Sequence, residues 1–329
     1  MKKQAVFIFL ITIIVSNFCF AQNYSQLAKS DTITIHSKIF ETERKIIVTK
    51  SLKIKDEARD NNCIVYMDAD DKNINGIFLQ SANNLMAFNE IPQSYLVGIM
   101  QEDRNKELLE KEKLYKFLTE EVIPMLNKTY SISQKITIAG HSFGGYFATY
   151  SFLKNNALFN SCIAISPAYW PNEKDVLLMM HDKINTVTGH FYLAVGDKRW
   201  DEISLRDYIF DARKLWSNSK TTRFSFTDLE GFSHNATPTV GFGLGLNHIY
   251  DEWEWENILE EQEKRLKSFP GFWGHIEIKG DALCHLNRRS EAKTVYREAL
   301  KSVSNDEKLA KEKSAELTKR LTNKIQNCP

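Results

Sequence analysis

The Gly-His-Ser-Phe-Gly pattern at residues 140–144 constrains the fold of this chain more than any other feature. A short β-branched run precedes it, and aromatic residues recur after it at helical spacing. A strand that turns sharply into a helix at such a pattern is a nucleophile elbow, in which the central serine points out beyond the sheet. Side chains at Gly140 and Gly144 would collide with the neighbouring strand and helix. The pattern therefore predicts Ser142 as a nucleophile at a helix N-terminus, where the helix dipole favours negative charge.

The rest of the chain favours an α/β fold around this elbow. Two β-rich runs, at residues 33–36 and 45–49, predict an antiparallel hairpin. Apolar runs that are continuous, as expected for strands buried on both faces, follow at residues 63–67, 95–99, 162–165 and 191–195. Because these strands alternate with helical segments, we expect a mostly parallel sheet flanked by helices, with ligands bound beyond the carboxyl ends of the strands.

The two ends of the chain differ from this pattern. Residues 1–21 have the basic start, short apolar core and small-x-small end of a secretory signal peptide. We therefore expect a secreted or periplasmic protein, and no later apolar stretch is long enough for membrane insertion. The predicted division is a signal peptide at 1–21, a hydrolase domain at 22–255 and an all-helical extension at 256–329.

Charge and cysteine content exclude some classes of function. The chain has 43 Lys and Arg against 42 Asp and Glu, which argues against a nucleic-acid partner. No closely spaced Cys and His set indicates a metal site, and Cys63 and Cys162 fall in predicted central strands. Cys284 and Cys328 could pair in an oxidising compartment, but the sequence leaves this open.

A serine nucleophile needs a histidine base, which follows the serine in the α/β-hydrolase order. His248 falls in a helical segment, while His275 and His285 belong to the C-terminal extension. His234 follows a further strand predicted at residues 224–226, in a polar loop. We therefore predict His234 as the base; the alternative is an ordinary surface histidine.

The acid that orients this histidine should lie in the loop after the strand at 191–195. Three carboxylates compete there: Asp197, Asp201 and Glu202. Asp197 is close to the strand end, so we favour Asp201, with Glu202 next. Each could instead be a solvated loop charge.

An oxyanion hole needs two preorganised donors. The backbone N–H of Phe143 is one by position, because it directly follows the nucleophile. The other is expected from the loop after the strand at 63–67, at the backbone of Ala69 or Asp70.

These motifs together resemble the esterase family of α/β-hydrolases that includes enterochelin esterases, feruloyl esterases and esterase-D-like enzymes. The resemblance covers about residues 33 to 255. It is carried by the sequence GHSFGG at 140–145, SPAYW at 166–170, VGI at 97–99 with Arg104 downstream, EGFSH at 230–234, Thr237-Pro238 and Gly243-Leu244. It implies a Ser-His-acid triad without a cofactor, with Ser142 and His234 in the first two roles. It also implies that Trp170 lines the substrate pocket, although a core aromatic is an equal alternative.

The C-terminal extension is similar in its spacing to a tetratricopeptide repeat. Small and aromatic residues recur at Gly280, Leu283, Ala292, Tyr296 and Ala299. One repeat cannot bury its own face, so it must pack on the hydrolase domain or on the last helix. We expect a helical cap on the catalytic domain, with a protein-binding module as the alternative.

The sequence therefore predicts a secreted serine esterase that hydrolyses a small-molecule carboxylic ester through an acyl-enzyme, without a cofactor. Two alternatives are an acyltransferase of the same fold and a hydrolase fold with a degraded triad that acts as a binding protein. The sequence does not specify the ester.

Overall fold

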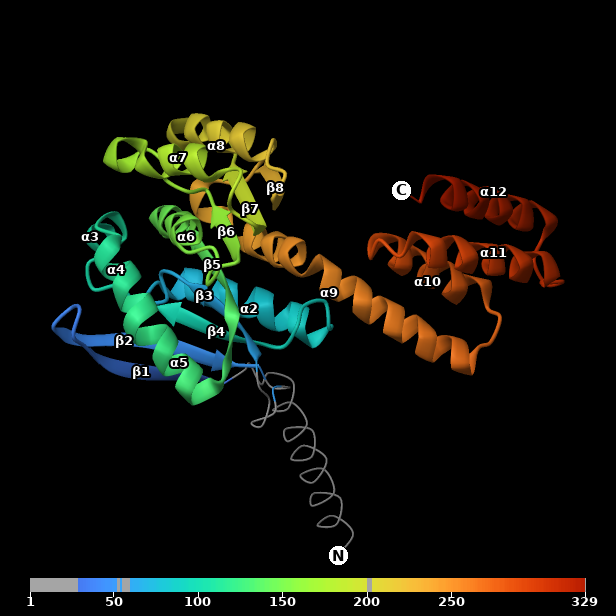
Figure 1. Cartoon of the computed structure of the whole chain (residues 1–329), viewed down its shortest axis with the longest axis horizontal. Coiled ribbons are helices and arrows are strands. Elements are labelled where there is room, and N and C mark those ends of the chain that lie inside the picture. Colours follow the sequence, from blue (N-terminus) through green and yellow to red (C-terminus); the bar gives the residue numbers. More distant parts are fainter. Residues whose placement is uncertain (1–28, 52–53, 55–59, 200–202, 329) are drawn as a thin grey trace, which may run out of the picture.

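The computed structural model describes residues 29–51, 54, 60–199 and 203–328 (Figure 1). The predicted signal peptide therefore lies outside the described residues, as do Asp201 and Glu202.

Eight strands form one sheet in the order β1-β2-β4-β3-β5-β6-β7-β8. Their bounds are β1 Ser30–Ser37, β2 Thr42–Lys50, β3 Asn61–Tyr66, β4 Ser94–Ile99, β5 Ile132–His141, β6 Ser161–Ile165, β7 Gly189–Gly196 and β8 Thr222–Leu229. Strand β2 is antiparallel to both β1 and β4, and every pairing from β4 to β8 is parallel. The predicted hairpin and the α/β class are confirmed.

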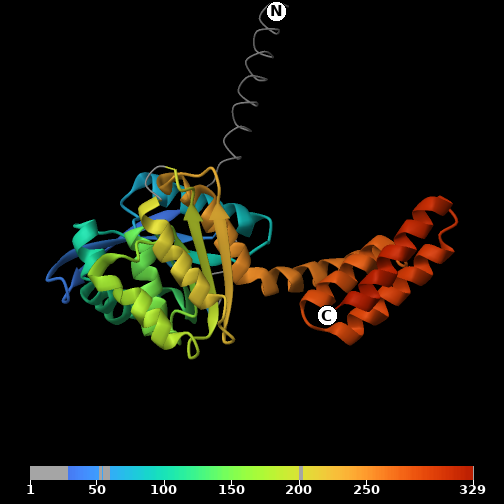
Figure 2. The ribbon, with the colours of Figure 1, turned by 90° about the horizontal axis from the view of Figure 1, so that it is seen from above.

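Helices cover both faces of this sheet, as Figure 2 shows edge-on. Their bounds are α2 Lys72–Ala87, α3 Arg104–Leu109, α4 Glu112–Lys116, the π-helical η1 Phe117–Val122, α5 Ile123–Tyr130, α6 Phe143–Lys154, α7 Pro171–Lys183, α8 Ile203–Trp216, the short 3-10 helix η3 His234–Ala236, α9 Pro238–Ser268, α10 Trp273–His285, α11 Arg289–Asn305 and α12 Lys311–Asn327.

The alternation of side chains along each central strand separates two apolar cores. On β3, Cys63 and Val65 face one core, with residues of α4 to α8, whereas Ile64 and Tyr66 face the other, with residues of α2 and α9. Every residue of β4 and of β6 is buried. A strand covered on both faces has no polar side, which explains why these segments are continuous apolar runs.

Helix α9 joins this sandwich to the C-terminal helices. Its first half packs on the sheet as far as Tyr250, where the helix is kinked, and its second half packs on α10 from Trp255 onward. The predicted domain boundary after residue 255 therefore lies within one helix, at the point where the packing partner changes. In Figures 1 and 2 this helix carries α10 to α12 away from the sheet.

The C-terminal helices have an apolar core of their own. A side chain at Gly280 would lie 2.5 Å from the ring of Tyr296, so the small residue allows α10 and α11 to approach closely. Leu317 and Leu321 of α12 complete this core, as expected for packing on the last helix. The expected cap is wrong: the helices form an extension, because their apolar faces are buried against α9 and one another and not against the sheet.

The structure resolves the pairing of Cys284 and Cys328, which the sequence left open. Cys284 and Cys328 form a disulfide with a Cα–Cα distance of 6.0 Å, while Cys63 and Cys162 are free and buried. Within the part of the chain that the structure describes, each helix is too short or too polar to cross a membrane.

Candidate active site

Ser142 lies at the turn from β5 to α6, in a backbone conformation that side chains rarely adopt. Its φ is 58° and its ψ is −120°, which costs on the order of 1–3 kcal/mol. The Ser142 N–H donates to the Ile165 carbonyl at 3.0 Å. The Ser142 carbonyl accepts the N–H groups of Tyr146 at 3.0 Å and Ala168 at 3.1 Å. These bonds to the next strand and to the following helix hold the strained turn that a nucleophile elbow requires.

The two glycines of the motif lie close to neighbouring atoms, Gly140 to the backbone and Gly144 to side chains. A Cβ at Gly140 would lie 2.2 Å from the backbone carbonyl carbon of Gly144. A Cβ at Gly144 would lie 3.0 Å from the Met67 Cβ and from a carboxylate oxygen of Asp68. A side chain at Gly140 would therefore displace the turn itself, whereas one at Gly144 would require the Met67 and Asp68 side chains to move.

A cavity of about 450 Å³ opens at the carboxyl ends of the strands, beside this turn. It is lined by Asp68, Asp71, Asn73, Ile74, Ile77, Arg104, His141, Ser142, His234 and Asn235. Two of the predicted catalytic residues, Ser142 and His234, therefore share one cavity although they are distant in sequence.

His234 enters the cavity from the loop after β8, as the first residue of η3. Its ring centre lies 4.4 Å from that of His141, which directly precedes Ser142. Burial lowers the pKa of His141 to about 3, so this second imidazole is neutral at pH 7. The site thus has one buried neutral histidine packed against the predicted base.

Of the three candidate acids, the structure describes one. Asp197 directly follows β7, and its carboxylate accepts the Arg199 guanidinium at 2.8 Å and the Gly231 N–H at 2.9 Å. The Asp197 N–H donates to the Phe232 carbonyl at 2.8 Å. The Arg199 hydrogen bond is the main cause that lowers the pKa of Asp197. Asp197 therefore links the end of β7 to the segment that leads to His234. The favoured Asp201 and the alternative Glu202 lie outside the described residues.

The two predicted oxyanion donors differ in their surroundings. Phe143 is the first residue of α6, where the helix offers its N–H no internal acceptor. The Ala69 N–H instead donates to the Ile99 carbonyl at 3.1 Å. Ala69 is therefore wrong as a second donor in this structure: the hydrogen bonding between the neighbouring strands β3 and β4 continues past the strand end and occupies its N–H.

An ion pair with a buried carboxylate and a partly exposed arginine lies beside the nucleophile, and it was not among the predicted site residues. Arg104 donates to both carboxylate oxygens of Asp68, at 2.7 and 2.9 Å. The Asp68 side chain is 2% exposed. Burial raises the pKa of Asp68, and the hydrogen bond from Arg104 opposes this rise. The signal for the pair is topological: the two residues follow β3 and β4, which are parallel neighbours, so their carboxyl ends lie together.

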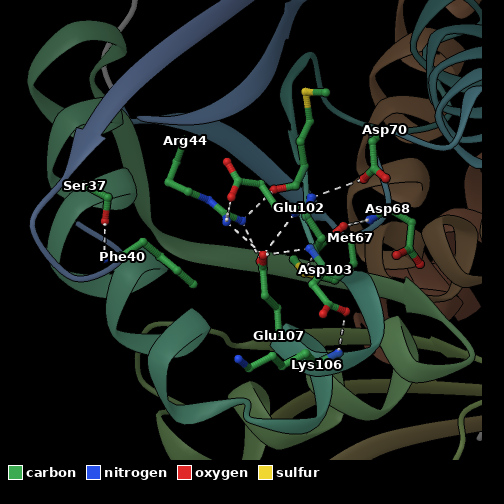
Figure 3. Close-up of polar contacts among 12 residues, drawn as sticks. Ser37, Phe40, Arg44, Met67, Asp68, Asp70, Glu102, Asp103, Lys106 and Glu107 are labelled. Atoms are coloured by element: carbon green, nitrogen blue, oxygen red, sulfur yellow. Dashed lines mark hydrogen bonds and ion pairs between the residues drawn. The ribbon is translucent and has the colours of Figure 1, made fainter. Parts of the chain in front are cut away.

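An ion pair in which both side chains are buried supports the loop that carries Arg104 (Figure 3). Arg44 of β2 donates to the two carboxylate oxygens of Glu107 at 2.8 and 2.5 Å. Glu107 also accepts the backbone N–H groups of Glu102 at 3.0 Å and Asp103 at 3.2 Å. The loop between β4 and α3 is therefore held by a buried ion pair and by two backbone hydrogen bonds to Glu107. These contacts position Arg104, which directly follows the loop.

Trp170 lies next to this site without lining the cavity itself. It is 48% exposed, and its ring centre is 5.9 Å from that of Phe143, the residue after the nucleophile. Three left-handed residues follow it at the start of α7, of which Asn172 donates to the Leu109 carbonyl at 3.1 Å. The exposed indole therefore lies beside the residue that follows the nucleophile, outside the lining of the cavity.

Comparisons with known proteins agree with this geometry. The family model described as "Putative esterase" matches residues 37–326, which includes the C-terminal helices. No curated protein is similar enough in sequence to be matched.

Several solved structures share the fold. An IroE-like serine hydrolase from Shewanella oneidensis is 12% identical, with a TM-score of 0.61, 92% of this chain covered and 100% of the other. An uncharacterised protein from Capnocytophaga ochracea is 14% identical, with a TM-score of 0.59 and coverage of 91% and 99%. The siderophore hydrolase EstB from Aspergillus nidulans is 16% identical, with a TM-score of 0.58 and coverage of 70% and 97%.

The likeness to these structures shows the fold, and the family match covers most of the chain. This chain belongs to the esterase family of α/β-hydrolases and is a carboxylic ester hydrolase.

Proposed function

We propose that the chain is a serine esterase that works through an acyl-enzyme at Ser142. The observation that carries this proposal is the strained Ser142 backbone, held at a helix N-terminus in a cavity shared with His234. Backbone strain of this kind is costly unless it serves a function. An elbow serine that faces a histidine is the arrangement that activates a hydroxyl for acyl transfer.

Each proton in the proposed reaction passes through His234. Ser142 Oγ attacks the ester carbonyl carbon while His234 takes the hydroxyl proton, and the carbonyl oxygen becomes an oxyanion. The Phe143 N–H donates to that oxyanion, and the Asp70 N–H is the proposed second donor. The intermediate collapses, and the departing alkoxide takes the proton from His234. Water then attacks the acyl-enzyme by the same route, which releases the acid and restores the Ser142 hydroxyl.

We propose a polar substrate for this site. Asp68, Asp71, Asn73, Arg104 and Asn235 line the same cavity as the serine. These groups would lose hydrogen bonds to water without replacement if a long alkyl chain filled the cavity. Trp170, beside Phe143, offers an aromatic surface for the part of the ester that extends beyond the cavity. Siderophore hydrolases and enterobactin esterases are among the solved structures with this fold, and a polar ester of that general kind would suit the lining.

We also propose that the protein acts outside the cytoplasm, after removal of residues 1–21. The disulfide between Cys284 and Cys328 supports this location, because such bonds persist in oxidising compartments.

Covalent labelling tests the proposed nucleophile directly. A fluorophosphonate should react once per chain, because Ser142 Oγ attacks phosphorus, fluoride leaves and His234 takes the proton. Mass spectrometry of the digested protein should place the adduct on the peptide that contains Ser142. An adduct on another serine, or no adduct at all, would contradict the proposal.

The triad acid can be identified by comparing three isosteric variants. We expect Asp201→Asn to lower kcat for p-nitrophenyl butyrate by about 10³- to 10⁴-fold, because an amide no longer stabilises the imidazolium of His234. Glu202→Gln and Asp197→Asn should each cost less than about tenfold, a modest positioning loss. Steady-state kinetics of the three purified variants provides the measurement. A loss confined to Asp197→Asn or to Glu202→Gln would move the acid to that residue.

A further inference from the structure

The backbone carbonyl of His234 accepts two side-chain hydrogen bonds, one from the end of β5 and one from Thr237, the residue between η3 and α9. His141 Nε2 lies 2.9 Å from the His234 carbonyl oxygen, and the Thr237 hydroxyl donates to the same oxygen at 2.7 Å. The Ser166 hydroxyl donates in turn to the Thr237 hydroxyl at 3.1 Å. Three side chains, from the ends of β5 and β6 and from the start of α9, are therefore linked to one carbonyl group.

The chemistry of this contact is fixed by the acceptor. A carbonyl oxygen can only accept, so His141 must carry its proton on Nε2. His141 is 5% exposed, while Ser166 and Thr237 are fully buried. Since burial keeps the His141 imidazole neutral, it places no positive charge against the ring of His234. Buried hydrogen bonds of this kind are costly to break, because the group left behind has no water to bond.

We propose that His141, Thr237 and Ser166 form a clamp that positions His234 as the catalytic base. This inference rests on the proposed function. The clamp holds the backbone of His234, the first residue of η3. It therefore determines the position and the direction from which the His234 side chain extends into the cavity. The triad acid acts on the ring, whereas the clamp acts on the backbone, and the two constraints are independent.

Position matters because His234 must reach two different atoms in each half-reaction. It takes the proton from Ser142 Oγ and returns it to the leaving oxygen. A displacement of about 1 Å in a proton-transfer group can cost on the order of 100-fold in rate. The clamp draws on three of the sequence motifs: the histidine of GHSFGG and the threonine of Thr237-Pro238 bond to this carbonyl directly, and the serine of SPAYW bonds to that threonine.

The test compares variants that keep the donor with variants that remove it. His141→Gln and Thr237→Ser retain a group that can donate to the His234 carbonyl, whereas His141→Phe and Thr237→Val do not. Thr222→Val is the matched control, because the buried Thr222 hydroxyl donates to the Val187 carbonyl at the opposite end of β8. Each full-length protein is assayed with p-nitrophenyl butyrate and with ethyl butyrate, and its melting temperature and its rate of fluorophosphonate labelling are measured.

We expect His141→Phe and Thr237→Val to lower kcat and the labelling rate by about 10- to 100-fold with little change in KM. The loss should be larger for ethyl butyrate than for p-nitrophenyl butyrate, since an alkoxide needs the returned proton and a nitrophenolate does not. The donor-retaining variants should recover most of the rate. Thr222→Val should lower the melting temperature as much as Thr237→Val does, with kcat unchanged.

Two results would overturn the clamp. One is wild-type kinetics in Thr237→Val and His141→Phe; the other is an equal kinetic loss in Thr222→Val, which would make the effect one of stability alone. If His141→Phe does not fold, the comparison of Thr237→Val with Thr237→Ser is sufficient to test the clamp. Ser142→Ala separates this inference from the proposed function: an inactive Ser142→Ala beside normal clamp variants refutes the clamp alone, while an active Ser142→Ala refutes the nucleophile.

Discussion

Replacing Ser142 with alanine is expected to lower kcat for p-nitrophenyl butyrate by about 10⁴- to 10⁶-fold, the range seen when a triad nucleophile is removed. Without Oγ no acyl-enzyme can form, and the ester can be attacked only by water within the cavity. The oxyanion donors remain, because Phe143 contributes its backbone N–H. We therefore expect a small residual rate above that of the buffer. Stopped-flow kinetics should also lose any burst of nitrophenolate.

Ser151→Ala is the matched control for this variant. Ser151 lies on the same helix, is fully buried, and donates its hydroxyl to the Phe147 carbonyl at 2.9 Å. Its loss tests whether any buried hydroxyl of α6 affects the rate. Retained activity in Ser142→Ala, or an equal loss in Ser151→Ala, would show that hydrolysis does not depend on Ser142 as nucleophile.

The elements that the sequence predicted well are those set by local patterns. The elbow depends on spacing within five residues, and the central strands are continuous apolar runs because both of their faces are buried. The strands at residues 63–67, 162–165 and 191–195 therefore appear in the structure within two residues of the predicted bounds. Cavity residues Ser142 and His234 could be named for the same reason: each follows a recognisable strand.

Contacts between distant segments could not be predicted in this way. Arg104 and Asp68 form a pair because β3 and β4 are neighbours in the sheet, and that adjacency is a property of the whole topology. The clamp on the His234 carbonyl joins the end of β5 to a residue 93 positions later in the chain. Every residue has a backbone carbonyl, so the sequence does not show which carbonyl a side chain will bond to. For this reason no pattern indicated that His141 would bond to the His234 carbonyl.

The expectation for Ala69 failed for a related physical reason. The sequence places Ala69 in the loop after a strand, and that placement does not show whether its N–H is already paired. Here the pairing of β3 with β4 extends beyond the last strand residue, and the Ala69 N–H bonds to the Ile99 carbonyl. The point at which the hydrogen bonding between two strands ends depends on both strands. The sequence of one strand alone therefore does not predict it.

His234→Ala is the second variant with a very large expected effect. We expect kcat for p-nitrophenyl butyrate to fall by about 10⁴- to 10⁶-fold, as for the nucleophile, because Ser142 cannot transfer its proton without a base. The double variant Ser142→Ala/His234→Ala should lose little more than either single variant, since two residues that act as one unit are not additive. The control variant His275→Gln alters a histidine on the distant helix α10, and its kcat should equal that of the wild type.

Added imidazole distinguishes a missing base from a damaged fold. The alanine variant leaves a space in a cavity of about 450 Å³, and free imidazole is small enough to enter it and accept the Ser142 proton. We expect imidazole to restore part of the rate in His234→Ala and none in the double variant, where no hydroxyl remains to be deprotonated. Rescue in the double variant would mean that imidazole attacks the ester by itself. A rate in His234→Ala within about tenfold of the wild type would assign the base to another residue, because general-base catalysis contributes at least about 10²-fold.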